Sequence, residues 1–405
     1  MSNATDTGSD NDRIGPLSDL RVLELGNIVA GPFASSMLAD LGADVVKIER
    51  PGDGDSIRSS GESGDAIFNA LNRNKRSIAI DLKDEDDLAA LYDLVDAADV
   101  FIENLGRGTP ERLGIGYQTL REQNSELIYL SIKGFQEGPY GDYAGMDVVA
   151  EAMSGLMSVT GEASRQPVRV GTSIADMGAA IYGVFGVMIA LREREQTGEG
   201  QRVDGTLFES AAHWMGYWQT YADKYGRDPE PLGASHPSWG LYDVFELNGG
   251  WLFVGVTNNR HWDAFCEAAD LSELRDDERF KTAADRRTNK DELLTIVQER
   301  LRDDDRSTLF KRLTEANVPA APVNQPSDLI NDPGLEAANL LARFQSNNDV
   351  KDELQTVLTP VSGERFSPAQ YRNPPSIGEH SEEVLAEWTE RTLNAPTTDQ
   401  NSEPQ

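Results

Sequence analysis

The amino-acid sequence predicts an α/β protein with a parallel sheet, followed by a second and smaller α/β domain. Two short apolar strand patterns, at residues 20–25 and 43–49, enclose a helical run at 33–42. This strand–loop–helix–strand order is a βαβ unit, which sets its two strands parallel. The Pro- and Gly-rich stretch at 228–238 is the clearest break in the chain, and we expect the second domain to follow it.

The βαβ pattern repeats along the first half of the chain. Strand patterns at 77–82, 100–104 and 127–132 alternate with helical patterns at 84–98 and 117–123. A helix is then expected at 177–191, a strand at 201–204 and a helix at 207–225. Beyond the break, strand patterns at 242–247 and 251–256 flank Asn248-Gly249-Gly250, which predicts a hairpin. Short amphipathic helices follow to residue 316.

Two polar tails frame the expected domains. Residues 1–16 form an acidic tail and residues 389–405 a second polar tail, and we expect both to be disordered. The large domain would begin with 17–228, and the small domain would cover 229–330. Pro-containing segments after residue 317 indicate a return path, so residues 331–388 would complete the large domain.

The charge of the chain limits the classes of partner that it can bind. It has 405 residues, with 69 acidic against 37 basic side chains and a formal net charge of −32. Such an excess repels nucleic acids and anionic membranes. With only nine lysines, the composition resembles that of cytoplasmic proteins of salt-loving archaea, where salt screens self-repulsion within about 3 Å at 1 M. We therefore expect a halophilic, cytoplasmic protein, because the polar N-terminal stretch also lacks the apolar core of a signal peptide.

Cysteine and histidine give no sign of a metal site. Cys266 is the single cysteine, which excludes an intrachain disulfide and a multi-cysteine metal site. The four histidines are scattered without the spacing of a ligand cluster. We therefore expect no metal.

Asp176 is the candidate nucleophile. It precedes an apolar, Gly- and Ala-rich run at 177–191, which is too short to span a bilayer and predicts a buried core helix. At the expected N-cap position, its carboxylate would accept hydrogen bonds from backbone N–H groups and face the positive end of the helix dipole. An ionised carboxylate held in this way can act as a nucleophile. The alternative is that Asp176 serves only as a helix cap.

The strand ends are the expected place for a ligand, because open α/β sheets bind ligands at the carboxyl ends of their strands. The loop at 26–32 is neither a dinucleotide fingerprint nor a P-loop, since G-x-G-x-x-G is absent and Pro32 stands where the lysine of a P-loop belongs. Basic residues gather in this half of the chain and suggest a phosphate-bearing anion, with solvated surface charge as the alternative. They are Arg50, Arg73, Lys75, Arg76, Lys83, Arg107 and Arg112.

Several phrases occur in the order in which a known enzyme family has them. They include VLELGNIVAGPFASSMLADLGADVVKIERPGDGD, NRNKRSIAIDLK, RLGIGY, LIYLSIKGF, TGEGQRV and VPAAPV. Together they resemble the family III CoA-transferases, which include formyl-CoA and carnitine CoA-transferases and the related α-methylacyl-CoA racemases. The resemblance runs over residues 17–388. It implies a Rossmann-like large domain built from both chain ends, a smaller domain, and an obligate homodimer of two interlocked, ring-like chains.

By this resemblance, the catalytic residue is Asp176. The implied mechanism is covalent and passes through an aspartyl anhydride and an aspartyl-CoA thioester. Coenzyme A thioesters are then substrates, and no permanently bound cofactor is implied. The family's CoA-contacting positions fall on Asn27, Val29, Arg50, Ile80, Lys83, Asn104, Leu105 and Arg112.

Two alternatives to the transferase stay open at this point. The racemases of the family use a His-Asp pair where this chain has Met146-Asp147. Racemisation needs bases on both faces of the α-carbon, and methionine cannot move a proton, so the transferase is favoured. A non-catalytic CoA-binding member is the other alternative, against which the intact Asp176 speaks. Met146, Asp147 and His236 are weak candidates for the substrate pocket, with helix capping by Asp147 and core packing of His236 as the plain alternatives.

The expected donor is succinyl-CoA, and the expected acceptor is mesaconate or a similar dicarboxylate. The glycine-rich loop of formyl-CoA transferases has no counterpart here, and Val29 replaces their glutamine, so the oxalate/formate pair is disfavoured. Malate, citramalate and an aromatic acid are further alternatives. A distal carboxylate needs a cation. The nominees are Arg165, Arg169 and Arg260, each with a surface or structural role as the alternative.

Overall fold

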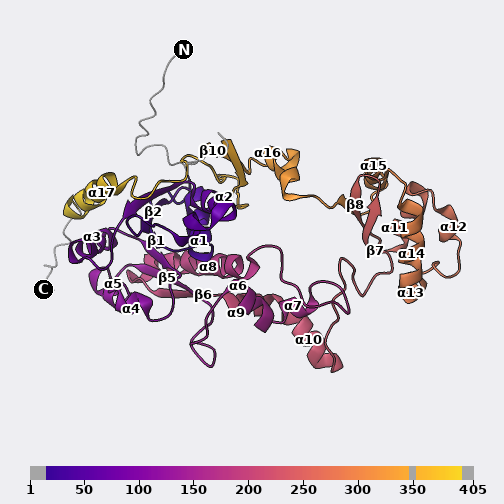
Figure 1. Cartoon of the computed structure of the whole chain (residues 1–405), viewed down its shortest axis with the longest axis horizontal. Coiled ribbons are helices and arrows are strands. Elements are labelled where there is room, and N and C mark those ends of the chain that lie inside the picture. The colour runs from indigo at the N-terminus through magenta and orange to yellow at the C-terminus, as the bar shows by residue number, and fades with distance from the viewer. Residues whose placement is uncertain (1–14, 346–352, 395–405) are drawn as a thin grey trace, which may run out of the picture. The chain divides into compact units, whose positions relative to one another are not determined.

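The computed structural model describes residues 15–345 and 353–394, which form two compact units (Figure 1). The large unit takes in the chain up to Gly155, then Val170–Tyr217 and the chain from Asn331 onward. The small unit takes in Leu156–Arg169 and Trp218–Ile330. Residues 156–169 and 218–228 thus lie in the small unit, although the sequence assigned them to the large domain. Of the expected tails at 1–16 and 389–405, residues 1–14 and 395–405 lie outside the described residues.

A six-stranded parallel sheet forms the centre of the large unit, which confirms the predicted fold class. The strand order is β3-β2-β1-β4-β5-β6. The order reverses between β1 and β4, and ligands of such sheets bind beside the carboxyl ends of the strands at this switch point. The strands are β1 (Arg21–Leu25), β2 (Asp44–Glu49), β3 (Lys75–Ala79), β4 (Val100–Glu103), β5 (Ile128–Lys133) and β6 (Arg202–Thr206).

Helices cover both faces of this sheet, and its strands are therefore apolar on both sides. One face packs against α1 (Ala30–Asp40) and α8 (Ile174–Thr197), with Val22, Ile102 and Leu130 pointing into that layer. The other face packs against α3 (Glu85–Asp96), α5 (Tyr117–Gln123) and α17 (Ser381–Asn394). In Figure 1 the yellow α17 lies beside the indigo α3, which brings the end of the described chain back to its beginning. Residues 389–394 belong to this helix, so the expected disorder from residue 389 is wrong for them.

Shorter elements connect the layers of the large unit. They are η1 (Ser56–Ser59), α2 (Gly61–Asn72), α4 (Thr109–Arg112), α6 (Asp147–Met153), α9 (Leu207–Trp214), α16 (Pro333–Ala337) and the antiparallel pair β10 (Leu341–Gln345) and β11 (Glu353–Val357).

The small unit has its own core around an antiparallel sheet of order β7-β8-β9, with Trp262, Phe265 and Phe280 buried. The predicted hairpin is confirmed, and Gly249 adopts the positive φ of 96° that its turn requires. The strands are β7 (Tyr242–Leu247), β8 (Gly250–Gly255) and β9 (Ala320–Pro322). The helices are α7 (Leu156–Val159), α10 (Gly216–Tyr225), which spans the unit boundary, α11 (Asn259–Ala268), α12 (Ser272–Arg275), α13 (Ala283–Thr288), α14 (Lys290–Leu301), α15 (Arg306–Glu315) and η2 (Pro326–Leu329).

Helix α8 is longer and less covered than the sequence predicts. It has 24 residues, and by length and composition alone it could cross a membrane, although such a helix is also found in protein cores. Its small residues let it approach the sheet closely, since a Cβ on Gly205 of β6 would lie 2.8 Å from the Ala179 carbonyl oxygen. Its opposite face is open, with Phe185 64% exposed. The expected buried core helix is therefore wrong for one face of α8, while its other face packs on the sheet and on α1.

Candidate active site

A cavity of about 520 Å³ lies at the carboxyl ends of β4 and β5, beside the switch point of the sheet. Its lining includes Asp176 from α8 and Ala30, the first residue of α1. The loop after β4 contributes Asn104, Leu105 and Arg107, β5 contributes Lys133, and the glycine-rich stretch after β5 contributes Asp142. The structure thus brings three predicted site residues, Asp176, Asn104 and Leu105, to one cavity of the large unit.

Asp176 is the third residue of α8, and the N-cap is Ser173. The expected capping role belongs to Asp147, the first residue of α6. Its Oδ1 accepts hydrogen bonds from the N–H of Ala175 (2.8 Å) and of Asp176 (3.3 Å). The Asp147 carboxylate thus holds the main chain of Asp176 in place. The half-buried side chain of Asp176 lies at the positive end of a long helix. An anionic side chain is stabilised at that place.

Asn104 fixes the geometry of the switch point. Its Oδ1 accepts a hydrogen bond from the N–H of Asn27 (2.8 Å), and its Nδ2 donates to the Asn27 carbonyl oxygen (2.9 Å). This pairing joins the loop after β1 to the loop after β4. Two residues that resemblance assigns to CoA binding are therefore bonded to each other. Val29, a third residue of that set, lies two positions after Asn27 and is buried at the N-cap of α1.

The other predicted CoA-binding residues lie outside the cavity lining but near the same edge of the sheet. Arg50 follows β2 and Ile80 follows β3, so both stand just beyond the carboxyl end of a strand. Arg50, Lys83 and Arg112 are exposed. Arg50 lies 3.4 Å from Asp53, and Arg112 donates to Thr109 at 3.0 Å. Their assignment to CoA stays a prediction.

Three basic residues that the sequence offered as phosphate ligands are buried in ion pairs instead. Lys75 lies 3.3 Å from Glu24, and Arg73 pairs with Asp40. Arg76 lies 2.6 Å from Asp44 and also pairs with two glutamates of α17. All three side chains stand at the amino end of β3 and are closed off by these partners. Their interpretation as ligand-binding residues is wrong.

Lys133 is a charged lining residue that sequence reasoning missed. Its Nζ donates to both carboxylate oxygens of Glu103 (2.7 and 2.6 Å) and to the Leu105 carbonyl oxygen (2.7 Å). Burial lowers the pKa of Lys133, although Glu103 opposes this effect. Glu103 also accepts the Leu105 N–H at 2.8 Å. The pair therefore shapes the loop that carries Asn104. Lys133 directly follows the strand pattern at 127–132, and this position in the sequence could have identified it.

The weaker pocket candidates are not among the residues that line this cavity of the large unit. Met146 is 65% exposed and does not line the cavity. His236 belongs to the small unit, where its ring packs against Trp239 with 4.2 Å between centroids. Burial, then the charge of Lys290, lowers the pKa of His236. Arg165, Arg169 and Arg260 are also residues of the small unit. Among the described residues, no three His, Cys, Asp or Glu side chains gather as a metal site would require.

Comparison with known proteins places this geometry in one family. Residues 17–381 match the model of CoA-transferase family III. The succinate–glutarate CoA-transferase of Agrobacterium fabrum is 38% identical over 385 residues, covering 92% of this chain and 95% of that protein. The succinyl-CoA:mesaconate CoA-transferase of Haloarcula marismortui is 35% identical over 387 residues, covering 92% and 96%.

A solved structure agrees with these relatives. The crystal structure of a CAIB/BAIF family protein from Brucella suis matches with a TM-score of 0.85 at 33% identity, and the match covers 92% of this chain and 99% of that one. Its covered length includes most of both units. The chain therefore belongs to CoA-transferase family III, and it is a CoA-transferase.

Proposed function

We propose that the protein moves CoA from succinyl-CoA to a free dicarboxylic acid, with mesaconate as the leading acceptor and Asp176 as the nucleophile. The observation that carries the proposal is the position of Asp176 in the cavity at the switch point, at the N-terminal end of α8. The choice of acids is supported by relatives named as succinyl-CoA:mesaconate and succinate–glutarate CoA-transferases.

The proposed reaction begins when the Asp176 carboxylate attacks the thioester carbonyl, which forms a mixed anhydride and releases CoA thiolate. The thiolate attacks the Asp176 carbonyl, so that free succinate leaves and an aspartyl-CoA thioester remains. The acceptor carboxylate attacks this thioester, which forms a second anhydride and releases the CoA thiolate again. The thiolate then attacks the acceptor's carbonyl, which yields the new acyl-CoA and restores Asp176. Covalent catalysis of this kind divides one exchange into steps of similar energy.

The cavity walls suit such intermediates. Anhydrides hydrolyse, so the site must keep water away from them. Glycines 106, 108, 134, 141 and 145 line the cavity, and their lack of a side chain lets the main chain approach the reacting carbonyl. Backbone N–H groups that approach the reacting carbonyl closely can stabilise an oxyanion. Among the described residues that line the cavity there is no histidine, the residue that the family's racemases pair with an aspartate.

The experiment that tests the function is a mass-spectrometric CoA exchange in molar KCl. Succinyl-CoA would be offered with mesaconate, glutarate, malate, citramalate, oxalate, formate and an aromatic acid. We expect mesaconyl-CoA to form fastest. A faster reaction with another acid would replace the acceptor but keep the transferase. No exchange with any acid, together with deuterium incorporation into a 2-methylacyl-CoA, would overturn the proposal in favour of the racemase.

Within this proposal, Arg107 is the cation that binds the distal carboxylate of the acceptor. The cavity is lined by two cationic side chains among the described residues, and Lys133 already donates to Glu103 and Leu105. Arg107 donates to the Phe135 carbonyl oxygen at 3.2 Å and lies 3.6 Å from the exposed Glu137. A guanidinium has five N–H donors, so these two contacts leave it donors for a carboxylate.

Replacing Arg107 by Gln should raise the KM for mesaconate by about tenfold or more, because a charge-assisted hydrogen bond is lost. The KM for an acceptor with one carboxylate should stay within about twofold. Steady-state exchange with both acceptors checks this prediction. Arg112→Gln is the control, and it should affect the KM for succinyl-CoA instead. An equal loss for both acceptors in Arg107→Gln would contradict the assignment.

We also propose that a second copy of the chain covers the open face of α8, as the family resemblance implies. Ile181, Phe185, Met188 and Ile189 form this face and are exposed in the single chain. The other side of α8 contacts β5, β6 and α1, so a bilayer could not surround the helix. The net charge of −32 also disfavours an anionic membrane surface.

Changing Phe185 to Asp should lower the share of chains that assemble into the dimer, because a carboxylate in an apolar interface is costly to desolvate. Sedimentation velocity at micromolar protein in molar KCl measures the change. Val361→Asp, at an exposed apolar residue outside α8, is the matched control and should stay dimeric. A monomeric wild type, or a Phe185→Asp variant as dimeric as the wild type, would contradict this proposal.

A further inference from the structure

The turn between β1 and α1 holds a residue in a costly conformation. Ile28 has a φ of 66°, in the left-handed region that β-branched residues rarely adopt. Its side chain is 47% exposed, so packing of that side chain does not explain the conformation. Backbone strain of this kind persists only where surrounding structure imposes it, and it gathers at functional sites. The contacts of the Ile28 backbone therefore show what holds this residue in the left-handed conformation.

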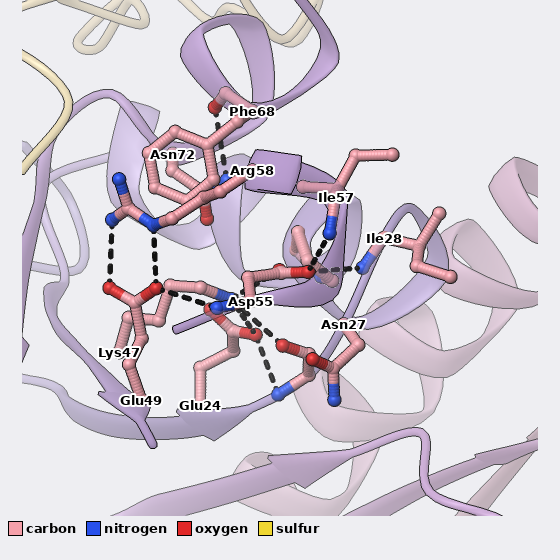
Figure 2. A network of polar contacts seen from close by, with 12 residues as sticks. Glu24, Asn27, Ile28, Lys47, Glu49, Asp55, Ile57, Arg58, Phe68 and Asn72 are labelled. Atoms are coloured by element: carbon pink, nitrogen blue, oxygen red, sulfur yellow. Dashed lines mark hydrogen bonds and ion pairs between the residues drawn. The ribbon is translucent and has the colours of Figure 1, made fainter. Parts of the chain in front are cut away.

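Asp55 binds the Ile28 main chain directly, as Figure 2 shows. The Ile28 N–H donates to Asp55 Oδ1 at 3.1 Å, and the N–H of Ile57 donates to the same oxygen at 3.0 Å. The other oxygen, Oδ2, lies 3.0 Å from Lys47 Nζ. Asp55 is 2% exposed. A buried carboxylate is thus shared between the strained residue and an internal lysine.

The same cluster holds the residues before Ile28. Lys47 Nζ donates to the Gly26 carbonyl oxygen at 2.8 Å, and Glu24 Oε1 accepts the Gly26 N–H at 2.7 Å. Glu24 and Lys47 are themselves paired at 3.2 Å. Asn104 binds both backbone groups of Asn27. Successive peptide groups from Gly26 to Ile28 are therefore fixed by side chains from three strands or their loops.

The charges of this cluster support each other. Burial alone would raise the pKa of Asp55, but the charge of Lys47 and the N–H groups of Ile57 and Ile28 outweigh it and lower that pKa. Burial would lower the pKa of Lys47, yet Glu24 and Asp55 raise it. Glu49 accepts the Asp55 N–H at 3.0 Å and pairs with Arg58 at 2.8 Å. Asp55 is thus held as a carboxylate in one orientation (Figure 2).

We propose that Asp55 is a positioning residue for CoA transfer, which acts by holding Ile28 in its left-handed conformation. The turn ends at Val29 and delivers Ala30, the first residue of α1, to the wall of the cavity that also contains Asp176. Asn104, bonded to Asn27, lines the same wall. A relaxed Ile28 would change the path of residues 27–30 and so the fit of the thioester beside Asp176. This inference rests on the proposed function of that cavity.

A double-mutant cycle separates this role from a merely structural one. Glycine adopts positive φ without steric cost, so in the Ile28→Gly background the turn no longer depends on Asp55. We expect Asp55→Ala to lower kcat/KM for succinyl-CoA by about tenfold or more in the otherwise wild-type chain. In the Ile28→Gly background the same change should cost less than about threefold. Ile28→Ala is the matched control, because it trims the side chain and keeps the strain, and it should stay as sensitive to Asp55→Ala as the wild type.

The cycle is read by steady-state CoA exchange, with melting temperature recorded for each variant. An equal loss from Asp55→Ala in all three backgrounds would overturn the proposal. If Asp55→Ala does not fold, Asp55→Asn replaces it in the cycle, and it should show the same ordering with smaller effects because an oxygen acceptor is kept. If the wild type itself exchanges no CoA, the proposed function fails; additive losses in an active enzyme contradict only the role of Asp55.

Discussion

Asp176→Asn should abolish CoA exchange, with a fall in kcat of about 10³-fold or more. An amide oxygen is a poor nucleophile and cannot form the anhydride, so the covalent route is closed while the shape of the site is kept. The residue lines the cavity and sits three residues into α8. Mass-spectrometric exchange with succinyl-CoA and mesaconate measures the loss.

Asp142→Asn provides the control for this change, because Asp142 lines the same cavity from an exposed loop. It should keep at least about a third of wild-type exchange and a normal melting temperature. Peptide mapping after incubation with succinyl-CoA should also find CoA attached to the peptide that contains Asp176. Substantial exchange by Asp176→Asn, or an adduct on another residue, would show that Asp176 is not the nucleophile.

Arg76→Met should lower the free energy of unfolding by about 3–5 kcal/mol, because removing one partner leaves buried carboxylate charge without its cation. Arg76 is nearly fully buried and lies 2.6 Å from Asp44, 2.9 Å from Glu383 and 2.6 Å from Glu387. Burial works against the charge of Arg76, but Asp44 and the two glutamates raise its pKa. Denaturant unfolding in molar KCl measures the loss.

Hydrogen exchange should show where the Arg76→Met variant loosens. We expect faster exchange in residues 381–388 of α17, whose glutamates lose their partner on β3. Arg112→Met serves as the control, since Arg112 is exposed and its guanidinium donates a hydrogen bond to Thr109 on the surface. The free energy of unfolding of this variant should change by less than about 0.5 kcal/mol. A similar small change in Arg76→Met would mean that the ion pairs contribute little.

The sheet could be predicted because parallel strands carry long apolar runs whose spacing shows in the sequence. The boundaries were less secure, and β3 occupies Lys75–Ala79 although the strand pattern was placed at 77–82. The reason is physical: Lys75 and Arg76 are charged residues that enter the strand only because Glu24 and Asp44 neutralise them inside the fold. A local pattern does not contain such distant partners.

The candidate site, like the sheet, could be predicted only in part. Asp176 and Asn104 could be placed from the sequence pattern, since one begins a helix and the other follows a strand, and these places meet at the edge of a parallel sheet. Leu105, which lines the same cavity, was expected from the family resemblance alone. The hydrogen bond that Asp147 accepts at the start of α8 could not be predicted, because it depends on how α6 packs against α8 and joins residues 28 positions apart. The open face of α8 was also missed, since a run of apolar residues does not reveal which of them a single chain can cover.

The return of α17 to the first strands affects how the chain can be made. Arg76 and Glu387 are 311 residues apart, so at about 5–20 residues per second the ribosome needs roughly 15–60 s to supply the partner. Throughout that interval Leu23 and Phe101 lie on a sheet face that still lacks Trp388, while the whole of the small unit emerges. The nascent protein must therefore carry an unfinished apolar layer until translation is nearly over, and exposed apolar surface of this kind is prone to aggregation.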